Sequence, residues 1–548
     1  MLAPLVAVRG GSLHLQLPLL PAFASLSAAY ALFALYRRRR DLTAAATSPH
    51  DFLRAGTSLL RWLTAYREVH CRSYPVISAS RPNALRDALP PAAPEAPEPF
   101  SAILSDCTRL ILPALTHWEN SAKFFAYFKP HSSYPAVLAE LMAAGLNVMG
   151  FDWIASPAAT ELEVVTLDWL GDILHLPPRF LSRAPGPGGA VIQGSAGEAA
   201  IVVLLAATRR AQRRAASLPE TAPPLSDVHS DTNRHRCVVY CSDQTHAIVT
   251  KACLVLGLSV CSLPTTAADG YTLRGATLSA AIAAHLAEGK LPVAVVATSG
   301  TTTSCAFDPL AEIAAAAAPH SLWVHVDAAY GGAYACLDEV LPLFAGLDAC
   351  DSFCVNAHKK LLCPFDLAAL YVADRTPLLA ALSLTPEYLR NDASESGAVV
   401  DFEHWQLGLG RRFRALKLWF VLRRFGASGI RAHVRRGTSL ALTFAQRVEA
   451  SPFLSLAAPV SLSLVCFRCA PLHPAAAAGD AADDELQTAL LEAVKAKGVF
   501  IIHSRLGGVK ILRLACGGVE QRRREVIAAF EVIEAEAKRV RAARMAAA

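Results

Sequence analysis

Strand-like segments alternate with helical segments through the middle of this 548-residue chain, and this alternation constrains the fold most strongly. Four apolar, strand-like runs cover residues 237–242, 291–297, 322–326 and 352–355, and mostly helical segments separate them. Alternating β and α segments predict a mostly parallel sheet with helices on both faces. We therefore expect an α/β fold built on one large sheet.

Polar or small residues follow these strands at the points where each strand ends. His246 follows the first strand, Thr302 the second, Asp327 the third and Lys359 the fourth. A fifth signal is the Gly-Ser-Ala-Gly run of residues 194–197, which precedes a strong helix. The carboxyl ends of parallel strands form one rim of the sheet, where ligands bind in such folds. The sequence therefore predicts a binding site at this rim.

The segment 351–372 is predicted to form a strand, a tight turn and a second strand, with Lys359 and Lys360 in the turn. Taken alone, two neighbouring lysines are more often solvated, because lysine side chains are usually exposed. A lysine between two buried strands is badly placed for solvation unless it has a chemical task. One such task is to form an imine with a carbonyl cofactor, which requires an amine that can deprotonate.

A pyridinium aldehyde phosphate would use all of these signals. Ser195, Ala196 and Gly197 offer backbone amides and a hydroxyl to a phosphate at a helix N-terminus. Lys359 supplies an amine for the aldehyde, and Asp327 supplies a carboxylate that keeps the ring nitrogen protonated. Taken one at a time, these residues have ordinary explanations. Ser195, Ala196 and Gly197 are equally consistent with a simple helix start, and Asp327 is equally consistent with a helix cap. The combination favours a cofactor of this kind, pyridoxal 5'-phosphate (PLP).

Other residues of the same rim supply the remaining contacts that such a cofactor needs. His246 and Ala329 can pack on the two faces of the ring. Asn356, His358 and Thr302 can tether the oxygen atoms of the cofactor. For His246 alone, a histidine whose hydrogen bonds are satisfied in the core is the ordinary alternative.

Several motifs resemble those of the PLP-dependent aromatic-L-amino-acid decarboxylases. They include IQGSAGEA, SDQTH, TSGTTT, HVDAAY, NAHKKLL and HWQLGLGRRFRALKLWF, and the resemblance covers residues 48–540. It implies the type I aminotransferase-like fold and a homodimer with a shared active site. It also implies that Lys359 binds the cofactor, that Asp327 faces the ring nitrogen and that His246 stacks on the ring. Further cofactor contacts implied by the resemblance are Ala196, Gly197, Thr302 and Asn356.

The resemblance also suggests a proton donor and reveals three departures. Tyr388 matches a family tyrosine on a mobile loop of the partner subunit that protonates Cα, although it could be an ordinary loop aromatic. Lys360 stands where the family has an aromatic residue, and Gly197 where it often has a serine. Pro130 stands near a threonine of animal members. Lys360 therefore bears on local packing, and Pro130 on substrate preference.

We expect decarboxylation of an aromatic L-amino acid to the arylalkylamine and CO2. In plant relatives the position of Gly410 resembles a selector, where glycine accompanies indolic substrates and serine phenolic ones. Tryptophan is therefore favoured over tyrosine or dopa, although animal relatives with glycine accept dopa. A tight backbone turn is the structural alternative for Gly410.

Three other functions are alternatives to decarboxylation of an aromatic L-amino acid. Plant aldehyde synthases share the fold but typically carry phenylalanine at the position of Tyr388. A decarboxylase of non-aromatic amino acids fits poorly with the aromatic-rich residues 118–134. A cofactor-free scaffold fits poorly with the presence of both Asp327 and Lys359.

The composition indicates which partners and which cellular compartment to expect. The net charge of +6, from 52 basic and 46 acidic residues, indicates no nucleic-acid partner. Fourteen cysteines, many inside apolar runs, are typical of buried thiols in a reducing compartment. Cys466 and Cys469 form a lone CxxC in a strand-like run, where residues i and i+3 point to opposite faces. We therefore expect no metal site.

Residues 17–36 carry no charge and precede four arginines. A membrane anchor through residues 17–40, an organelle-targeting segment and a disordered extension all remain open. Without a targeting role for this segment, we expect a cytoplasmic protein. Four parts are predicted: an N-terminal extension (1–47), an N-terminal helical domain (48–133), a large PLP-binding domain (134–437) and a small C-terminal α+β domain (438–548).

Overall fold

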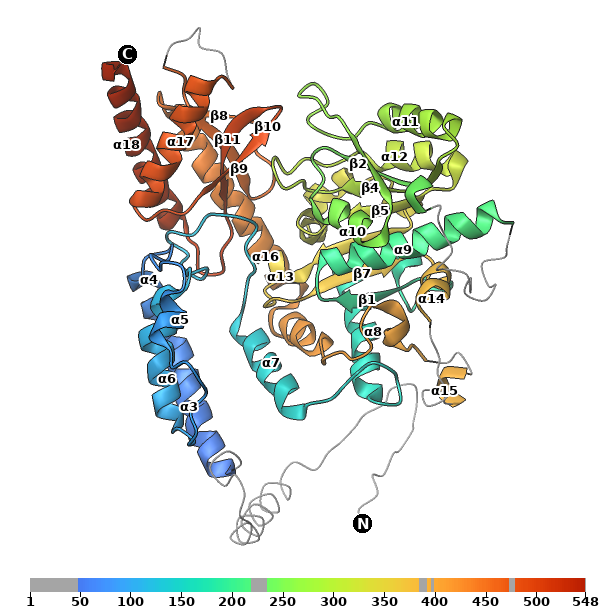
Figure 1. The fold of residues 1–548 in the computed structure, drawn as a ribbon, viewed down its shortest axis with the longest axis horizontal. Helices are drawn as coiled ribbons and strands as arrows, with labels where there is room; N and C mark the ends of the chain where they lie inside the picture. The colour runs from blue at the N-terminus through green and yellow to red at the C-terminus, as the bar shows by residue number, and fades with distance from the viewer. Residues whose placement is uncertain (1–47, 218–233, 384–391, 396–398, 473–478, 548) are drawn as a thin grey trace. The chain divides into compact units, whose positions relative to one another are not determined.

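The computed structural model divides into two compact units (Figure 1). It describes residues 48–217, 234–383, 392–395, 399–472 and 479–547. The first unit holds residues 48–70 and 80–115 of this described chain, and the second holds residues 71–79 and the described residues from 116 onward. The domain boundaries predicted at residues 133 and 437 remain predictions. The predicted anchor at residues 17–40 and Tyr388 lie outside the described residues.

The first unit is helical, as the pattern predicts. Its helices are α3 (Pro49–Ala65), α5 (Ala84–Ala88) and α6 (Phe100–Asp106), with π-helical turns at Tyr66–His70 and Cys107–Ile111 and a 3-10 turn at Leu112–Ala114. Trp62 Nε1 donates a 2.9 Å hydrogen bond to the Thr108 hydroxyl and so joins two of these segments. The three α-helices contain no buried residue. Across all described ranges, no helix is long and apolar enough to cross a bilayer.

A seven-stranded sheet forms the core of the second unit (Figure 1). Its order is β1 (Gly189–Gln193), β7 (Ala368–Val372), β6 (Ser352–Asn356), β5 (Trp323–Asp327), β4 (Leu291–Thr298), β2 (Cys237–Ser242) and β3 (Ser259–Leu263). Strand β7 runs antiparallel to both of its neighbours, and the pairs from β6 to β3 are parallel. The mostly parallel sheet predicted from the sequence is therefore confirmed.

Helices cover both faces of this sheet. Alternate residues of a strand point to opposite faces, so each apolar strand presents side chains to helices on both sides. On one face, Val239 and Cys241 pack with α9 (Ala196–Ala215), α10 (Ile248–Leu256) and α14 (Thr376–Leu382). On the other, Val238 and Tyr240 pack in a cluster with α8 (Pro157–Ile173), α11 (Gly275–Ala287), α12 (Leu310–Ala317) and α16 (Ala415–Ala450). Helix α7 (Tyr134–Leu146) contacts α16, which is kinked at Gly426, where φ is 63°.

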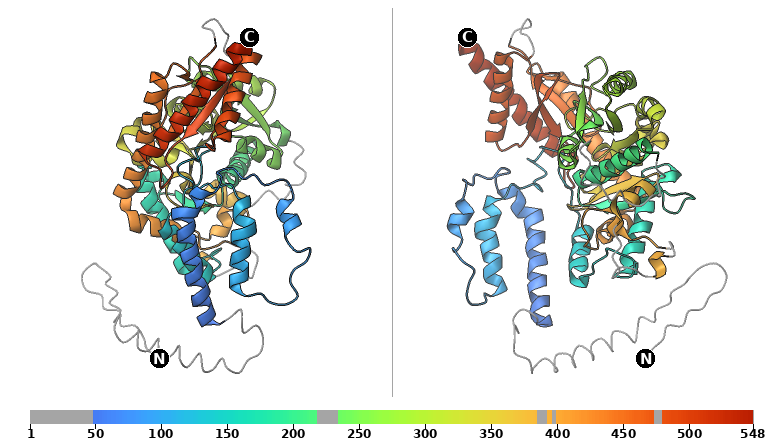
Figure 2. Two further views of the ribbon diagram at one scale, coloured as in Figure 1. Left: turned by 90° about the vertical axis from the view of Figure 1, so that its left-hand side faces the viewer. Right: turned by 45° about the vertical axis from the view of Figure 1, so that its right-hand side comes forward.

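The C-terminal part of this unit forms a separate small α+β layer, as predicted (Figure 2). Its antiparallel sheet has the order β10 (Ile502–Leu506), β11 (Val509–Ala515), β9 (Leu464–Cys469) and β8 (Leu454–Leu456). Helices α17 (Ala481–Ala496) and α18 (Arg523–Ala547) pack on it around a core of their own. The short helices α4 (Cys71–Ser73), α13 (Ala357–Lys360) and α15 (Asp392–Glu395) complete the α-helices of the described residues.

Candidate active site

The ends of three adjacent strands bring the predicted cofactor residues to one rim. In the register of the sheet, Thr298 of β4 pairs with Asp327 of β5, and Asp327 pairs with Cys354 of β6. The chain continues from β6 directly into α13, which carries Lys359. The turn between the strands of the lysine unit is therefore a four-residue helix with a following loop, and it starts at this rim.

Lys359 has the electrostatic properties that a reactive amine needs. It is partly accessible, unlike its buried neighbours His358 and Lys360. Burial lowers the pKa of Lys359, while Asp327 and Cys354 act to raise it. A lysine with a lowered pKa supplies a neutral amine more readily than an ordinary surface lysine does.

Asp327 is buried and lies close to the other charged groups of the rim. Its side chain is 5% exposed, and Oδ1 accepts a 3.1 Å hydrogen bond from the amide of Ala329. Its backbone carbonyl accepts a 2.9 Å hydrogen bond from the amide of Ser299. The Asp327 charge raises the pKa of both His246 and Lys359, so the three predicted residues are neighbours. A carboxylate in this position suits a protonated ring nitrogen.

His246 presents a neutral ring. Partial burial lowers the pKa of His246, Asp327 opposes this, and Lys359 lowers it further. Nδ1 accepts a 3.1 Å hydrogen bond from the amide of Ile248, which places the proton of the neutral ring on Nε2. The imidazole remains exposed on its outer side, so a planar cofactor has access to it. On the same rim Ala329 is buried, and its carbonyl accepts a 3.1 Å bond from the amide of Asn356.

The predicted phosphate subsite lies at the N-terminus of α9, a helix of 20 residues. Ser195 is its N-cap, and its Oγ accepts a 3.2 Å hydrogen bond from the amide of Glu198. Glu198 in return accepts a 2.8 Å hydrogen bond from the amide of Gly194. The amides of Ala196 and Gly197 lie in the first turn, where intrahelical acceptors do not exist and an anion can bind.

The two glycines of this turn differ in what constrains them. A Cβ on Gly194 would lie 2.9 Å from both carboxylate oxygens of Glu198, so the Glu198 side chain would have to shift to admit one. A Cβ on Gly197 would meet Ser195 Oγ at 3.5 Å, an ordinary contact. A serine would therefore fit at Gly197, and the departure from the family pattern carries no steric cost.

One buried side-chain oxygen at the rim is available to a hydrogen-bond donor. Asn356 is 5% exposed, and its Oδ1 has no hydrogen-bond partner among the described residues. The neighbouring Ser299 Oγ is also buried and unpaired within the described chain. His358 is held by a 3.1 Å bond from the amide of Leu367 to its Nδ1, and burial lowers the pKa of His358 to about 4. Thr302 is half-buried in the loop after β4.

The sequence did not point to Asp308, which fixes the loop that contains Thr302. Asp308 is fully buried and accepts 2.7 Å hydrogen bonds from the amides of Thr298 and Leu273. Burial raises the pKa of Asp308 to about 7. The available signal is an acid-proline pair shortly after a strand, which is too common to identify such a residue from one sequence.

The two predicted substrate residues lie in different surroundings. Pro130 is half-buried, and the next residue, His131, donates its amide to the carbonyl of His358 at 2.7 Å. The loop of Pro130 therefore lies against the lysine turn. Gly410 is exposed, and a Cβ there would meet Met149 Sδ at 3.5 Å. The structure thus brings Pro130 to the rim and leaves room at Gly410, without placing Gly410 beside Lys359.

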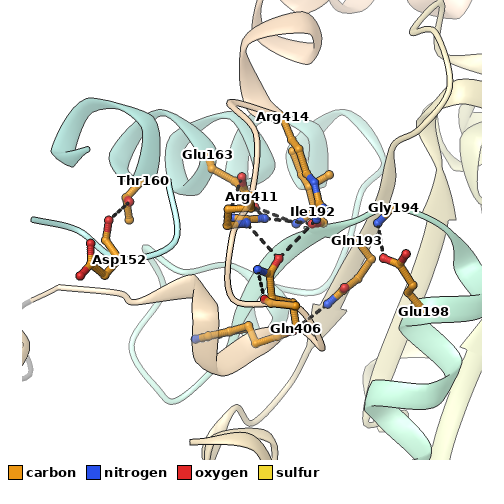
Figure 3. Close-up of polar contacts among 12 residues, drawn as sticks. Asp152, Thr160, Glu163, Ile192, Gln193, Gly194, Glu198, Gln406, Arg411 and Arg414 are labelled. Atoms are coloured by element: carbon orange, nitrogen blue, oxygen red, sulfur yellow. Dashed lines mark hydrogen bonds and ion pairs between the residues drawn. The ribbon is translucent and has the colours of Figure 1, made fainter. Parts of the chain in front are cut away.

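A buried polar network connects the loop of Gly410 to β1 (Figure 3). Arg411 binds Glu163 through Nη2 and Oε1 at 2.8 Å, and both side chains are almost fully buried. Arg411 also donates to the carbonyl of Ile192 at 2.9 Å and to Gln406 Oε1 at 3.1 Å. Because β1 leads directly to Gly194, this network joins the loop to the predicted phosphate subsite.

These residues fit PLP. The rim offers a depressed-pKa lysine, a buried carboxylate, a neutral imidazole and a helix N-terminus. The buried Asn356 Oδ1, which has no partner among the described residues, can accept a hydrogen bond at the same rim. Such a donor set matches an aldehyde, a ring nitrogen, a ring face and a phosphate, which are the groups that PLP presents.

Comparison with known proteins agrees with this chemistry. The model of the pyridoxal-dependent decarboxylase conserved domain matches residues 82–470. Tyrosine decarboxylase 2 of Narcissus pseudonarcissus is 41% identical over 469 residues, 85% of this chain and 90% of that protein. Phenylacetaldehyde synthase of Arabidopsis thaliana is 40% identical over 468 residues, 85% and 91% of the two chains.

A solved structure supports the same assignment for the fold. The crystal structure of Oryza sativa TDC with PLP and tryptamine has a TM-score of 0.85 and 36% identity, and it covers 90% of this chain and 99% of that one. The type I PLP-dependent fold expected from the motifs is therefore confirmed. The chain belongs to the pyridoxal-dependent decarboxylase family, and its cofactor is PLP.

Proposed function

We propose that this protein decarboxylates an aromatic L-amino acid to the arylalkylamine and CO2, with tryptophan favoured over tyrosine and dopa. The observation that carries this proposal is the grouping of Lys359, Asp327 and His246 at one rim, where each affects the charge state of another. When bound, PLP supplies a carbonyl for the substrate amine and a ring that accepts the electron pair of the breaking Cα–carboxylate bond.

The residues of the chain have separate tasks in this proposal. Asp327 holds a proton on the ring nitrogen, and its burial keeps water from competing for that proton. Lys359 would hold the cofactor through its carbonyl until a substrate amine takes its place. His246 and Ala329 hold the ring between them. Ser195, Ala196 and Gly197 bind the phosphate, and Thr302, Asn356 and His358 bind the remaining oxygen atoms.

An aromatic substrate is supported by the relatives and by the loops. Two relatives are named for tyrosine decarboxylation and phenylacetaldehyde synthesis, and tryptamine is bound in the rice structure. Phe128, next to Lys129 and Pro130, stacks on Tyr330 with ring centroids 3.4 Å apart. Gly410 leaves space beside the flexible side chain of Met149. A bicyclic indole is accommodated better with glycine at this position than with serine.

Aldehyde synthesis is the second candidate, because a relative at 40% identity carries that name. That reaction consumes O2 and water and releases the aldehyde, CO2, ammonia and hydrogen peroxide. We propose that Tyr388 protonates Cα and so favours the amine; Tyr388 lies outside the described residues. Tyr388→Phe should then divert turnover from amine to aldehyde and peroxide, whereas an unchanged amine yield would assign the proton to another group.

We further propose a homodimer with a shared active site. Large apolar side chains on and after α7 are exposed, including Leu138, Leu141, Met142, Leu146 and Met149. Such a patch is more typical of an interface than of a free surface. Mixing Lys359→Ala with Tyr388→Phe protomers tests the shared site: mixed dimers regain decarboxylation only if the two residues serve one site from different subunits.

A cytoplasmic location is our proposal for the compartment. All fourteen cysteines are free in the structure, and most are buried, which suits a reducing environment. No metal or nucleic-acid partner is part of the proposed reaction. Fluorescence imaging of the full chain beside a version without residues 1–47 tests this location, and retention at a membrane or in an organelle would contradict it.

Product analysis tests the proposed function. The purified protein, loaded with PLP, is incubated separately with tryptophan, tyrosine, dopa and glutamate, and amine, aldehyde, CO2 and peroxide are measured. We expect amine and CO2 in equal amounts from an aromatic substrate, without peroxide. Equal amounts of aldehyde and peroxide would assign the protein to the synthases, and turnover of glutamate alone would contradict an aromatic substrate.

A further inference from the structure

Lys360, the neighbour of the proposed cofactor lysine, is buried and bonded to the C-terminal layer. It is 4% exposed, and its Nζ donates a 2.6 Å hydrogen bond to the carbonyl of Cys516, just after β11. It is therefore not the solvated turn lysine that its neighbourhood in the sequence suggests. A buried lysine beside a reactive one needs an explanation, because burying an ammonium group is costly.

The surroundings are shaped to fit this side chain. Gly517 has a φ of 102°, and a Cβ there would lie 2.5 Å from Lys360 Nζ, so the lysine requires glycine at this position. The ammonium group lies 5.7 Å from the ring centroid of Tyr330 and 6.0 Å from that of Tyr334. Aromatic faces at this distance stabilise a cation. The side chain of Lys360 thus reaches the boundary with the C-terminal layer.

The charged and titratable groups that surround Lys360 include no carboxylate among its strongest electrostatic neighbours. Burial lowers the pKa of Lys360 to about 7; Cys516 and Cys305 act to raise it, and Lys129 and Arg436 to lower it. Three groups of residues face it. Lys129 and His131 lie on the loop of Pro130, and His433 and Arg436 lie on α16. The others are Cys305, Tyr330, Tyr334 and Cys516. Its amine therefore changes charge near neutral pH.

The same turn is tied at other points. The carbonyl of His358 accepts the amide of His131 at 2.7 Å, and His358 Nδ1 accepts the amide of Leu367 at 3.1 Å. Lys359 consequently lies between two residues that are each fixed to another part of the chain. The bond from Lys360 to Cys516 is the tie on the side of the C-terminal layer.

We propose that Lys360 is a positioning residue: by anchoring α13 to the carbonyl of Cys516, it holds the backbone of Lys359 at the distance from Asp327 that the cofactor requires. This inference rests on the proposed role of Lys359. It also gives the C-terminal layer a function in the reaction, since the anchor lies outside the seven-stranded sheet.

Lys360→Met tests this role, because it keeps the length of the side chain and removes its N–H donors. Lys538→Met, at an exposed lysine of α18, is the matched control. We expect kcat of Lys360→Met to fall about 10- to 100-fold with KM nearly unchanged, because misplacing a reacting group by about 1 Å costs this much. The dissociation constant of PLP, measured by titrating the apo-protein, should rise several-fold.

The melting temperature of the apo-proteins supplies a readout that needs no activity. Between pH 7 and 10.5 the unfolded chain binds more protons at Lys360 than the folded chain does, so folding stability rises with pH across this window. The melting temperature of the wild type minus that of Lys360→Met should therefore increase from pH 7 to pH 10. The difference between wild type and Lys538→Met should stay constant.

The possible results distinguish failure of the inference about Lys360 from failure of the proposed function. Lys360→Met with the kcat and PLP affinity of Lys538→Met would overturn the inference, as would a lower stability with unchanged kcat. If Lys360→Met does not fold, Lys360→Gln replaces it: its amide keeps a polar group at this position, but its side chain is one bond shorter than that of lysine and so weakens the bond to Cys516. We expect a reduced kcat there, and wild-type kcat and PLP affinity would overturn the inference. A wild type that binds PLP at Lys359 but releases no amine would contradict the proposed function. In that case the dissociation constant of PLP for Lys360→Met still tests the positioning role of Lys360.

Discussion

The rim that carries the predicted cofactor residues and the loop that carries Gly410 are held in place by different means. At the rim, Asp327 and Asn356 are the last residues of adjacent strands, so the hydrogen-bond ladder of the sheet sets their positions. Gly410 lies on a loop outside any strand, where side chains such as Arg411 provide the attachment. The backbone thus places Asp327 and Asn356, two residues proposed to act on PLP, whereas side-chain contacts place one residue proposed to select the substrate.

This difference suggests how the two regions respond to substitution. Rim variants should lose the chemistry while the fold survives, because the ladder does not depend on their side chains. Loop variants should change stability or substrate preference instead. The following four predictions test this contrast, in order of decreasing effect.

Lys359→Ala should abolish turnover, because the neighbouring lysine points into the C-terminal layer and cannot replace it. The variant should retain the secondary structure of the wild type by circular dichroism, and the visible absorption of bound cofactor should disappear. Retained turnover would show that another amine serves the cofactor and would break the contrast at its strongest point.

Asp327→Asn should lower kcat by several orders of magnitude with little loss of stability. A neutral amide cannot hold the proton on the ring nitrogen in a buried site, although its oxygen can still accept the amide of Ala329. The kinetics and the thermal melting curve of the same preparation check both parts. Near-normal kcat would remove the role of Asp327 in stabilising the ring charge.

Arg411→Met should destabilise the fold by about 3–5 kcal/mol, because it leaves the buried Glu163 without its charge partner. Arg412→Met is the control on the same loop: Arg412 is exposed and pairs with Glu140, and such surface pairs contribute about 0–1 kcal/mol. Denaturant midpoints compare the two variants. Equal midpoints would show that the buried network does not hold the loop.

Gly410→Ser should change preference and leave stability nearly unaltered, because a Cβ meets only Met149 at 3.5 Å. We expect the ratio of kcat/KM for tryptophan to that for tyrosine to fall about 10-fold, within the 1–3 kcal/mol that pocket size differences supply. An unchanged ratio would leave a broad aromatic decarboxylase without a selector at this position.

The same contrast explains how far the sequence predicts the structure. The strands before His246, Asp327 and Lys359 were evident because they are apolar and end in polar residues, and parallel strands bring such ends together. Strands β1 and β3 were not evident: β1 is a short run between glycines, and β3 is an edge strand with half-exposed residues. Local pattern is weak in both cases, and tertiary pairing decides.

The substrate side was less predictable for a physical reason. The contact of His131 with the lysine turn is a backbone bond between residues 227 positions apart, which no local pattern encodes. The buried pair of Arg411 and Glu163 spans 248 positions. The burial of Lys360 depends on Gly517, whose importance appears only when the two segments meet. Long-range pairings of this kind require the folded chain.

The assignment of Lys359 is tested most directly by reducing the PLP-loaded protein with borohydride and mapping the modified peptide by mass spectrometry. We predict one pyridoxyl group for each chain, attached to Lys359, and none after the same treatment of Lys359→Ala. A pyridoxyl group on Lys360 in the wild type would contradict both the site and the inferred anchor, because the bond to Cys516 would then have to break.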